Sequence, residues 1–100
     1  MTTQTNGITI TEIRIRLNPR DRDGSCPVAG WAAFVANDAL YLNNITIRRH
    51  SSGRFTLEYP AHETGVSRFT IFKPISKEVG DMIERVVMDA FQVEKARSAQ

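Results

Sequence analysis

The fold of this chain is decided by residues 30–42, which read Gly-Trp-Ala-Ala-Phe-Val-Ala-Asn-Asp-Ala-Leu-Tyr-Leu. From Trp31 to Ala36 the side chains are apolar on both alternating faces, which is typical of a central strand covered on both sides. Asn37 and Asp38 follow, and both residue types tolerate the positive φ that a two-residue hairpin turn requires. Apolar residues resume at once, so the sequence predicts a central β-hairpin, with a bulge at residues 43–44.

The segments around this hairpin alternate between apolar and polar residues, as strands with one solvated face do. Further strands of this kind are expected at residues 12–17, 54–59 and 68–71. In the first of them, Arg14 and Arg16 lie on the polar side. Residues 61–67 surround a glycine and follow a proline, so they are expected to form a loop.

A long amphipathic helix is predicted from Lys77 to Ala96, because its apolar residues recur at the i, i+3, i+4, i+7 spacing. Pro74 breaks the chain before it, and Ser76 stands where an N-cap belongs. About five strands and one C-terminal helix make an α+β domain with a small antiparallel sheet. We expect residues 8–97 to form this single domain and residues 1–7 to be a disordered polar tail.

The composition gives no sign of catalytic or metal chemistry. The chain has 100 residues, 41% of them hydrophobic and 24% charged, which is ordinary globular composition. It has neither an apolar run of about 18 residues nor a signal peptide, so no membrane association and a cytoplasmic location are expected. The single cysteine, Cys26, excludes a thiolate cluster, and both histidines (His50 and His62) fall in turns or loops. We therefore expect no catalytic residues, no metal site and no cofactor.

Basic residues are concentrated in the middle of the chain, although the formal net charge is only +2. Residues 45–77 hold six basic and two acidic residues, and residues 78–100 hold three basic and five acidic ones. A positive surface attracts the phosphates of nucleic acid, although a basic bias of this size also fits an ordinary solvated surface. The candidate nucleic-acid contacts are Arg48, Arg49, Arg54, Arg68, Lys73 and Lys77. Arg48 and Arg49 are neighbours on a predicted strand, so their side chains are expected on opposite faces.

Four short segments follow one another along the chain: Ile-Thr-Glu-Ile-Arg-Ile-Arg at 10–16, Leu-Tyr-Leu-Asn-Asn-Ile-Thr-Ile at 40–47, Gly-Arg-Phe-Thr-Leu-Glu-Tyr-Pro at 53–60, and Lys-Pro-Ile-Ser at 73–76. In this order the chain resembles the SpoVG family, the bacterial stage V sporulation protein G or septation regulator proteins, over residues 8–92. The resemblance implies a homodimer with a curved antiparallel sheet and a C-terminal helix. It also implies a regulator linked to sporulation and cell-division septation that binds DNA and RNA.

Two features bear on the partners of this chain. The apolar strand around Trp31 needs cover on both faces and one helix shields only one, which separately favours a homodimer. Residues 60–63 read Pro-Ala-His-Glu, where members of the family usually carry a basic stretch. The alternative function is therefore a non-enzymatic protein–protein interaction module that has lost nucleic-acid binding and docks a protein partner, for example at a sheet edge.

Overall fold

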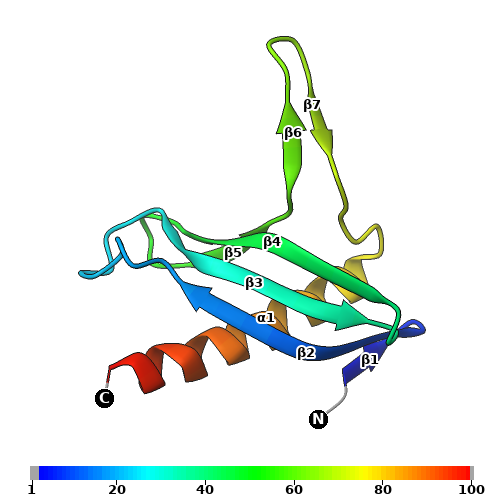
Figure 1. Cartoon of the computed structure of the whole chain (residues 1–100), viewed down its shortest axis with the longest axis horizontal. Helices are drawn as coiled ribbons and strands as arrows, with labels where there is room; N and C mark the ends of the chain where they lie inside the picture. Colours follow the sequence, from blue (N-terminus) through cyan, green and yellow to red (C-terminus); the bar gives the residue numbers. More distant parts are fainter. Residues whose placement is uncertain (1–2, 100) are drawn as a thin grey trace.

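The computed structural model describes residues 3–99 as a curled antiparallel sheet with one helix on one of its faces (Figure 1). The sheet has five strands in chain order: β1 (Thr3–Thr5), β2 (Ile8–Leu17), β3 (Val28–Ala36), β4 (Leu40–Arg49) and β5 (Phe55–Glu58). A separate hairpin contains β6 (Ala61–Glu63) and β7 (Arg68–Thr70), and the helix α1 (Lys77–Ser98) follows. The predicted α+β class, with a five-stranded antiparallel sheet and one C-terminal helix, is confirmed.

The central hairpin joins β3 to β4 through the predicted two-residue turn. Asn37 and Asp38 have φ values of +54° and +52°, and the backbone N–H of Ala39 donates to the carbonyl of Ala36 at 3.0 Å. The side-chain oxygen of Asn37 also accepts a hydrogen bond from the N–H of Thr9 at 2.7 Å, which ties the turn to β2. The asparagine therefore both forms the turn and fixes the neighbouring strand.

Bulges curl the sheet, and the β3–β4 register also shifts between Val28 and Gly30. In β4 the register shifts opposite residues 32–34, and Asn44 has a φ of +61°, so the predicted bulge at residues 43–44 is confirmed. A second bulge, which the sequence did not predict, lies in β2 at Glu12, where φ is +51° and the register to β3 shifts between Thr11 and Arg14. A bulge adds one residue to one strand and increases its local twist.

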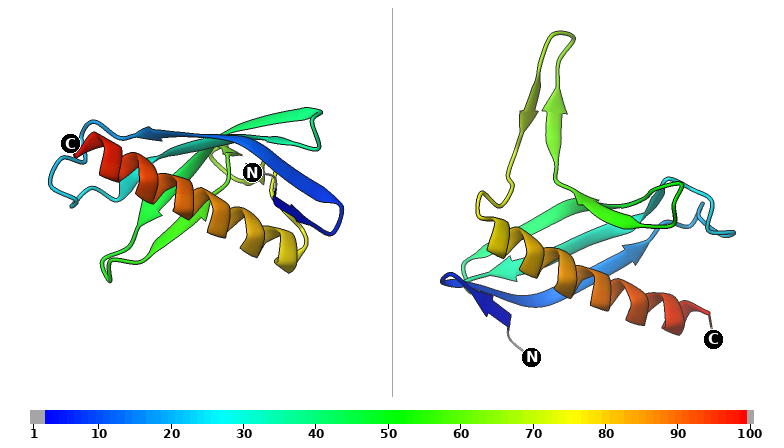
Figure 2. Two further views of the ribbon diagram at one scale, coloured as in Figure 1. Left: turned by 90° about the horizontal axis from the view of Figure 1, so that it is seen from below. Right: turned by 180° about the vertical axis from the view of Figure 1, so that it is seen from behind.

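The core lies between one face of the sheet and α1. The largest fully buried side chains from the strands are Ile10, Phe34, Ile45 and Ile47, and those from α1 are Met82, Val87 and Phe91. Each stabilises the fold by roughly 1.5–3 kcal/mol relative to an exposed position. In Figure 1 the helix lies behind the sheet, and the reverse view in Figure 2 shows it across that face. The opposite face of the sheet has no covering element among the described residues.

The helix begins as predicted. Ser76 is the N-cap, with extended backbone, and its hydroxyl accepts a hydrogen bond from the N–H of Val79 at 3.3 Å. The helix runs from Lys77 to Ser98, two residues beyond the predicted end. It is not long and apolar enough to cross a membrane, and no other helix is present in residues 3–99.

The segment after β5 differs from its prediction. Residues 68–71 were expected to add the last strand to the main sheet, and residues 61–67 to form a loop. Instead β6 pairs with β7 in a hairpin that projects away from the sheet, and we call residues 61–70 the arm (Figures 1 and 2). Its turn is closed by the N–H of Thr64, which donates to the carbonyl of Ser67 at 2.8 Å. Strands of three residues are too short for the alternation of their side chains to show which strand each one pairs with.

The N-terminus also differs from its prediction. Residues 3–5, part of the expected tail at 1–7, form β1 and pair with residues 8–10 of β2, while residues 1–2 lie outside the described residues. The connecting turn uses Asn6 and Gly7, with φ values of +51° and +78°. An edge strand pairs through its backbone and needs few apolar side chains. The polar composition of residues 3–5 is therefore the same as that expected of a disordered tail.

Candidate nucleic-acid interface

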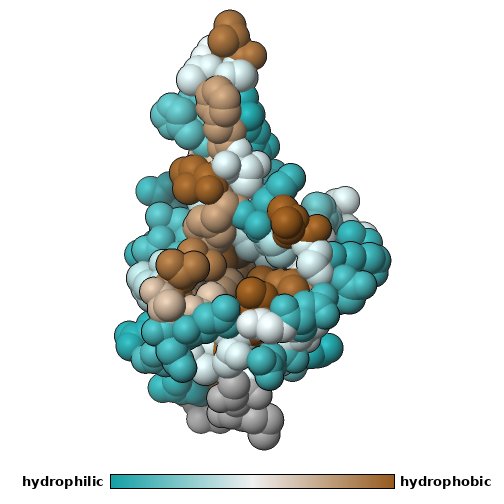
Figure 3. Space-filling view, turned by 90° about the vertical axis from the view of Figure 1, so that its right-hand side faces the viewer, coloured by the Kyte–Doolittle hydropathy of each residue, from teal (hydrophilic) through white to brown (hydrophobic). Residues whose placement is uncertain are grey.

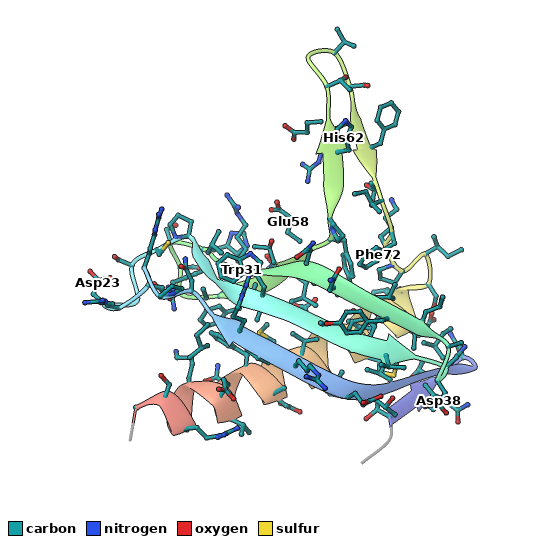
Figure 4. All side chains as sticks on the ribbon, viewed as in Figure 1. Asp23, Trp31, Asp38, Glu58, His62 and Phe72 are labelled. Atoms are coloured by element: carbon teal, nitrogen blue, oxygen red, sulfur yellow. The ribbon has the colours of Figure 1, made fainter. Side chains whose placement is uncertain are left out.

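The uncovered face of the sheet carries an aromatic and basic surface, which we call the open face. Strand register places Arg16, Trp31, Thr46 and Glu58 in one row across β2 to β5. Directly paired residues in a sheet share a face, and Figure 4 shows Trp31 and Glu58 on the side turned away from α1. Its other members include Thr11, Arg14, Ala33, Val35, Tyr41, Arg48 and Thr56.

Two arginines on β2 supply its positive charge. The guanidinium carbon of Arg16 lies 4.6 Å from the centre of the Trp31 ring, within cation–π range. Arg14 pairs with Ala33 in the next row and is exposed. Within residues 3–99 neither arginine forms a salt bridge. The sequence placed both on a polar strand face, but only the register of β2 on β3 brings them beside Trp31.

Arg48 and Arg68 are the two predicted contacts that the structure brings together. Arg48 lies 3.5 Å and Arg68 3.8 Å from the carboxylate oxygens of Glu58, and Arg68 also lies 3.6 Å from Glu63. These ion pairs join the base of the arm to the open face. A hollow of about 400 Å³ lies between the two, lined by Thr46, Glu58, Tyr59, Pro60, Ala61, Glu63 and Arg68.

Arg49 points to the other side of β4, as the alternation predicts, and is engaged inside the protein. Its Nη1 donates to both carboxylate oxygens of Asp21, at 2.7 and 2.8 Å, and to the carbonyl of Cys26 at 3.0 Å. The side chains of Arg49 and Asp21 are only 14% and 7% exposed. This pair borders a hollow of about 540 Å³ beside the end of α1. The structure therefore gives Arg49 an internal partner and leaves it out of the open face.

The three other predicted contacts are exposed but lie apart from the Arg48–Arg68 pair. Arg54 lies in the turn between β4 and β5, and Lys73 lies between the arm and α1. Lys77 opens the helix and donates to Asp81 at 2.9 Å, and this contact raises the pKa of Lys77. The structure thus divides the predicted set between the open face, the interior and separate surface sites.

The described residues offer no group that resembles a metal centre. Within residues 3–99 no three histidine, cysteine, aspartate or glutamate side chains come together as metal ligands. His50 shares a hydrogen bond of 2.7 Å with the hydroxyl of Thr56, and His62 is exposed on the arm. Cys26 is partly buried and accepts a 3.4 Å contact from the side-chain amide of Asn18.

The arm and the segment after it expose large apolar side chains. The exposed fractions are 97% for Val66, 57% for Phe69, 65% for Ile71 and 95% for Ile75. Figure 3 shows brown, hydrophobic surface at the tip of the arm and again where the arm meets the body. The sequence did not predict this surface, since it assigned Phe69 and Ile71 to a strand of the main sheet. These side chains make the arm and the segment after it a candidate interaction surface.

No protein-family model, no curated protein and no solved structure matches this chain. The likeness to the SpoVG family in the order of short segments is therefore an expectation from the sequence.

Proposed function

We propose that this chain is a bacterial regulatory protein of the SpoVG type, acting in the cytoplasm, that binds DNA or RNA as a homodimer. The order of its sequence segments and the basic bias of residues 45–77 support the regulatory and nucleic-acid assignments. The observation that carries the proposal is the open face, where Arg16 lies over Trp31 and Arg14 and Arg48 stand on the same face of a sheet that α1 leaves uncovered. Phosphates bind to such arrays of cations, and aromatic rings bind bases.

The test is a binding titration against single- and double-stranded DNA and RNA at low and moderate salt. Binding should weaken steeply as salt rises, because each neutralised phosphate releases counterions. The double variant Arg14→Ala with Arg16→Ala should flatten the slope of log K against log salt by about 1.4 for single strands.

The matched control is Arg85→Ala with Arg97→Ala, which removes the same charge from exposed positions on α1. It should leave the salt slope unchanged, because the slope follows the number of phosphates that side chains neutralise and these two arginines are not part of the open face. Equal losses in the two double variants would refute the open face as the interface. No binding of the unmodified protein at low salt would refute nucleic-acid binding altogether.

The homodimer in this proposal is supported by the arm. A two-stranded hairpin alone is at best marginally stable in water, and this one exposes Val66 and Phe69. A second copy that packs on the arm would remove these side chains from water. Light scattering at micromolar protein should give twice the chain mass of 11.3 kDa, and Phe69→Ser with Ile71→Ser should return it to the monomer mass. A monomer of the unmodified protein would refute the dimer.

The second candidate function is a non-enzymatic protein–protein interaction module. The same exposed apolar arm favours it, together with the exposed His62 and Glu63 at the position where a basic stretch was expected. An apolar contact barely changes with salt, whereas phosphate binding collapses. A protein that binds no nucleic acid at low salt but docks another protein through the arm, with affinity independent of salt, would favour this candidate.

A further inference from the structure

We infer that the open face takes single-stranded nucleic acid and discriminates against duplex, because unpaired bases stack on Trp31 and Tyr41. This inference rests on the proposed function and specifies its ligand. Three observations support it: the order of side chains along the face, the width of the sheet and the exposure of the aromatic rings.

Three successive rows of the open face carry its aromatic and basic groups. The first row pairs Arg16 with Trp31, the second pairs Arg14 with Ala33, and the third pairs Val35 with Tyr41. Trp31 and Val35 are four residues apart on β3, so the outer rows are separated by roughly 13 Å at about 3.3 Å per residue. The two arginines therefore lie on β2 and the two rings on β3 and β4, an order that suits a single strand with its phosphates along one side and its bases along the other.

Both aromatic rings are available for stacking. Tyr41 is 60% exposed, and Trp31 is partly exposed although it belongs to the central strand. The guanidinium of Arg16 lies over the Trp31 ring at 4.6 Å. Bases stack on arginine planes as well as on aromatic rings, so this pair presents a stacking surface whether Arg16 stays or moves aside.

A duplex cannot use these rings. Its bases are stacked on one another, and only their edges are accessible in the grooves. The major groove is about 12 Å wide and admits a helix or a two-stranded ribbon, whereas five strands spaced about 4.8 Å apart span roughly 19 Å. A duplex therefore contacts only the arginines of this face. A single strand contacts the arginines and the rings.

Glu58 limits the path of the strand. It lies at the β5 end of the Trp31 row, where Arg48 and Arg68 share its negative charge. Arg14 and Arg16, at the β2 end, have no acidic partner among the described residues. The phosphates are therefore expected over β2, with the bases directed toward β3 and β4.

The experiment uses the single tryptophan of the chain as its reporter. The probes are a 12-nucleotide oligothymidylate and a blunt 12-base-pair duplex, titrated in the same low-salt buffer. Stacking should quench the Trp31 emission with the single strand but not with the duplex, and the single strand should bind at least tenfold more tightly. Tyr41→Ser should weaken single-strand binding about tenfold, within the range measured for loss of one stacked base, and leave duplex binding unchanged.

Leu40→Ser is the matched control. Leu40 is the neighbour of Tyr41, is equally exposed at 60%, and pairs with Ala36 on the face of α1. Both variants change a surface residue, so the protein should remain folded. Equal affinity for the two probes, with the arginine variants still weakening both, would overturn the stacking inference while the proposed function stands. Failure of both probes to bind would overturn the two together.

Discussion

The ion pair between Arg49 and Asp21 allows a decisive test of where the arginines of β4 act. Sequence reasoning assigned Arg48 and Arg49 alike to phosphate binding. In the structure Arg49 lies on the core side of β4, where it donates to both oxygens of Asp21 and stands 5.2 Å from the centre of the Phe55 ring. Asp21 in turn accepts a hydrogen bond from the backbone N–H of Cys26 at 2.9 Å. Removing either partner leaves the other charge poorly solvated.

The expected loss of folding stability is large when Arg49 is replaced and small when Arg48 is replaced. Breaking a buried ion pair from one side costs about 3–5 kcal/mol, and the low end applies here because Arg49 is 14% exposed. Asp21→Ala and Arg49→Ala should each lower the free energy of unfolding by about 3 kcal/mol, which is a fall in Tm of roughly 12 °C or more. Arg48→Ala breaks an exposed pair of 3.5 Å, with both side chains 43% exposed, and should cost less than about 1 kcal/mol.

The assay is urea unfolding followed by circular dichroism, with a salt titration of nucleic-acid binding on the same three variants. Arg49→Ala should reduce stability without changing the salt slope, whereas Arg48→Ala should reduce stability only slightly. The double variant Asp21→Ala with Arg49→Ala should lose less than the sum of the two single losses, because the pair is removed as a unit. A flattened salt slope with unchanged stability in Arg49→Ala would refute the internal role and return this residue to the interface.

Three further predictions concern α1 and its surroundings. Gly80→Ala should stabilise the protein by up to about 1 kcal/mol, since an added Cβ would meet only the ring of Pro74, with Cγ at 3.5 Å and Cβ at 4.0 Å, in ordinary contact. A lower urea midpoint would contradict this. Ser76→Ala should lower the free energy of unfolding by about 1 kcal/mol, because it removes the N-cap acceptor. Thermal unfolding measures this loss, and an unchanged Tm would argue against the cap. Burial, reinforced by the carboxylate of Glu84, raises the pKa of Tyr59 to about 12, so stability should fall as pH rises from about 10 to 12, where the unfolded chain loses this proton first. Phenolate absorbance of a Tyr41→Phe variant should give that midpoint, and a value near 10 would contradict the burial.

The elements that could be predicted from sequence are those whose signal is local. The helix was identified because its apolar spacing persists over many turns and Ser76 caps it. The central hairpin was identified because Asn37 and Asp38 satisfy a backbone requirement that few residues meet. Both features are fixed by residues close together in the chain, so no knowledge of tertiary contacts was needed.

The arm and β1 were missed because their strands have three residues each. Alternation over three residues does not distinguish a strand of the main sheet from one that pairs elsewhere. Phe69 and Ile71 have the composition of core residues, yet they are 57% and 65% exposed. Their apolar character therefore does not reflect burial among the described residues.

The candidate interface shows where sequence periodicity stops being informative. Alternation correctly placed Arg14 and Arg16 on one face and Arg48 and Arg49 on opposite faces, but it could not identify partners across strands. The bulge at Glu12 matters most, because Ile10 is buried against α1 and strict alternation from Ile10 would turn Arg14 and Arg16 toward the core. The extra residue resets the alternation, so that the two arginines face Trp31 and Ala33 instead. The place of Arg14 and Arg16 on the open face therefore depends on the bulge at Glu12, which the alternation of residues 12–17 does not by itself locate.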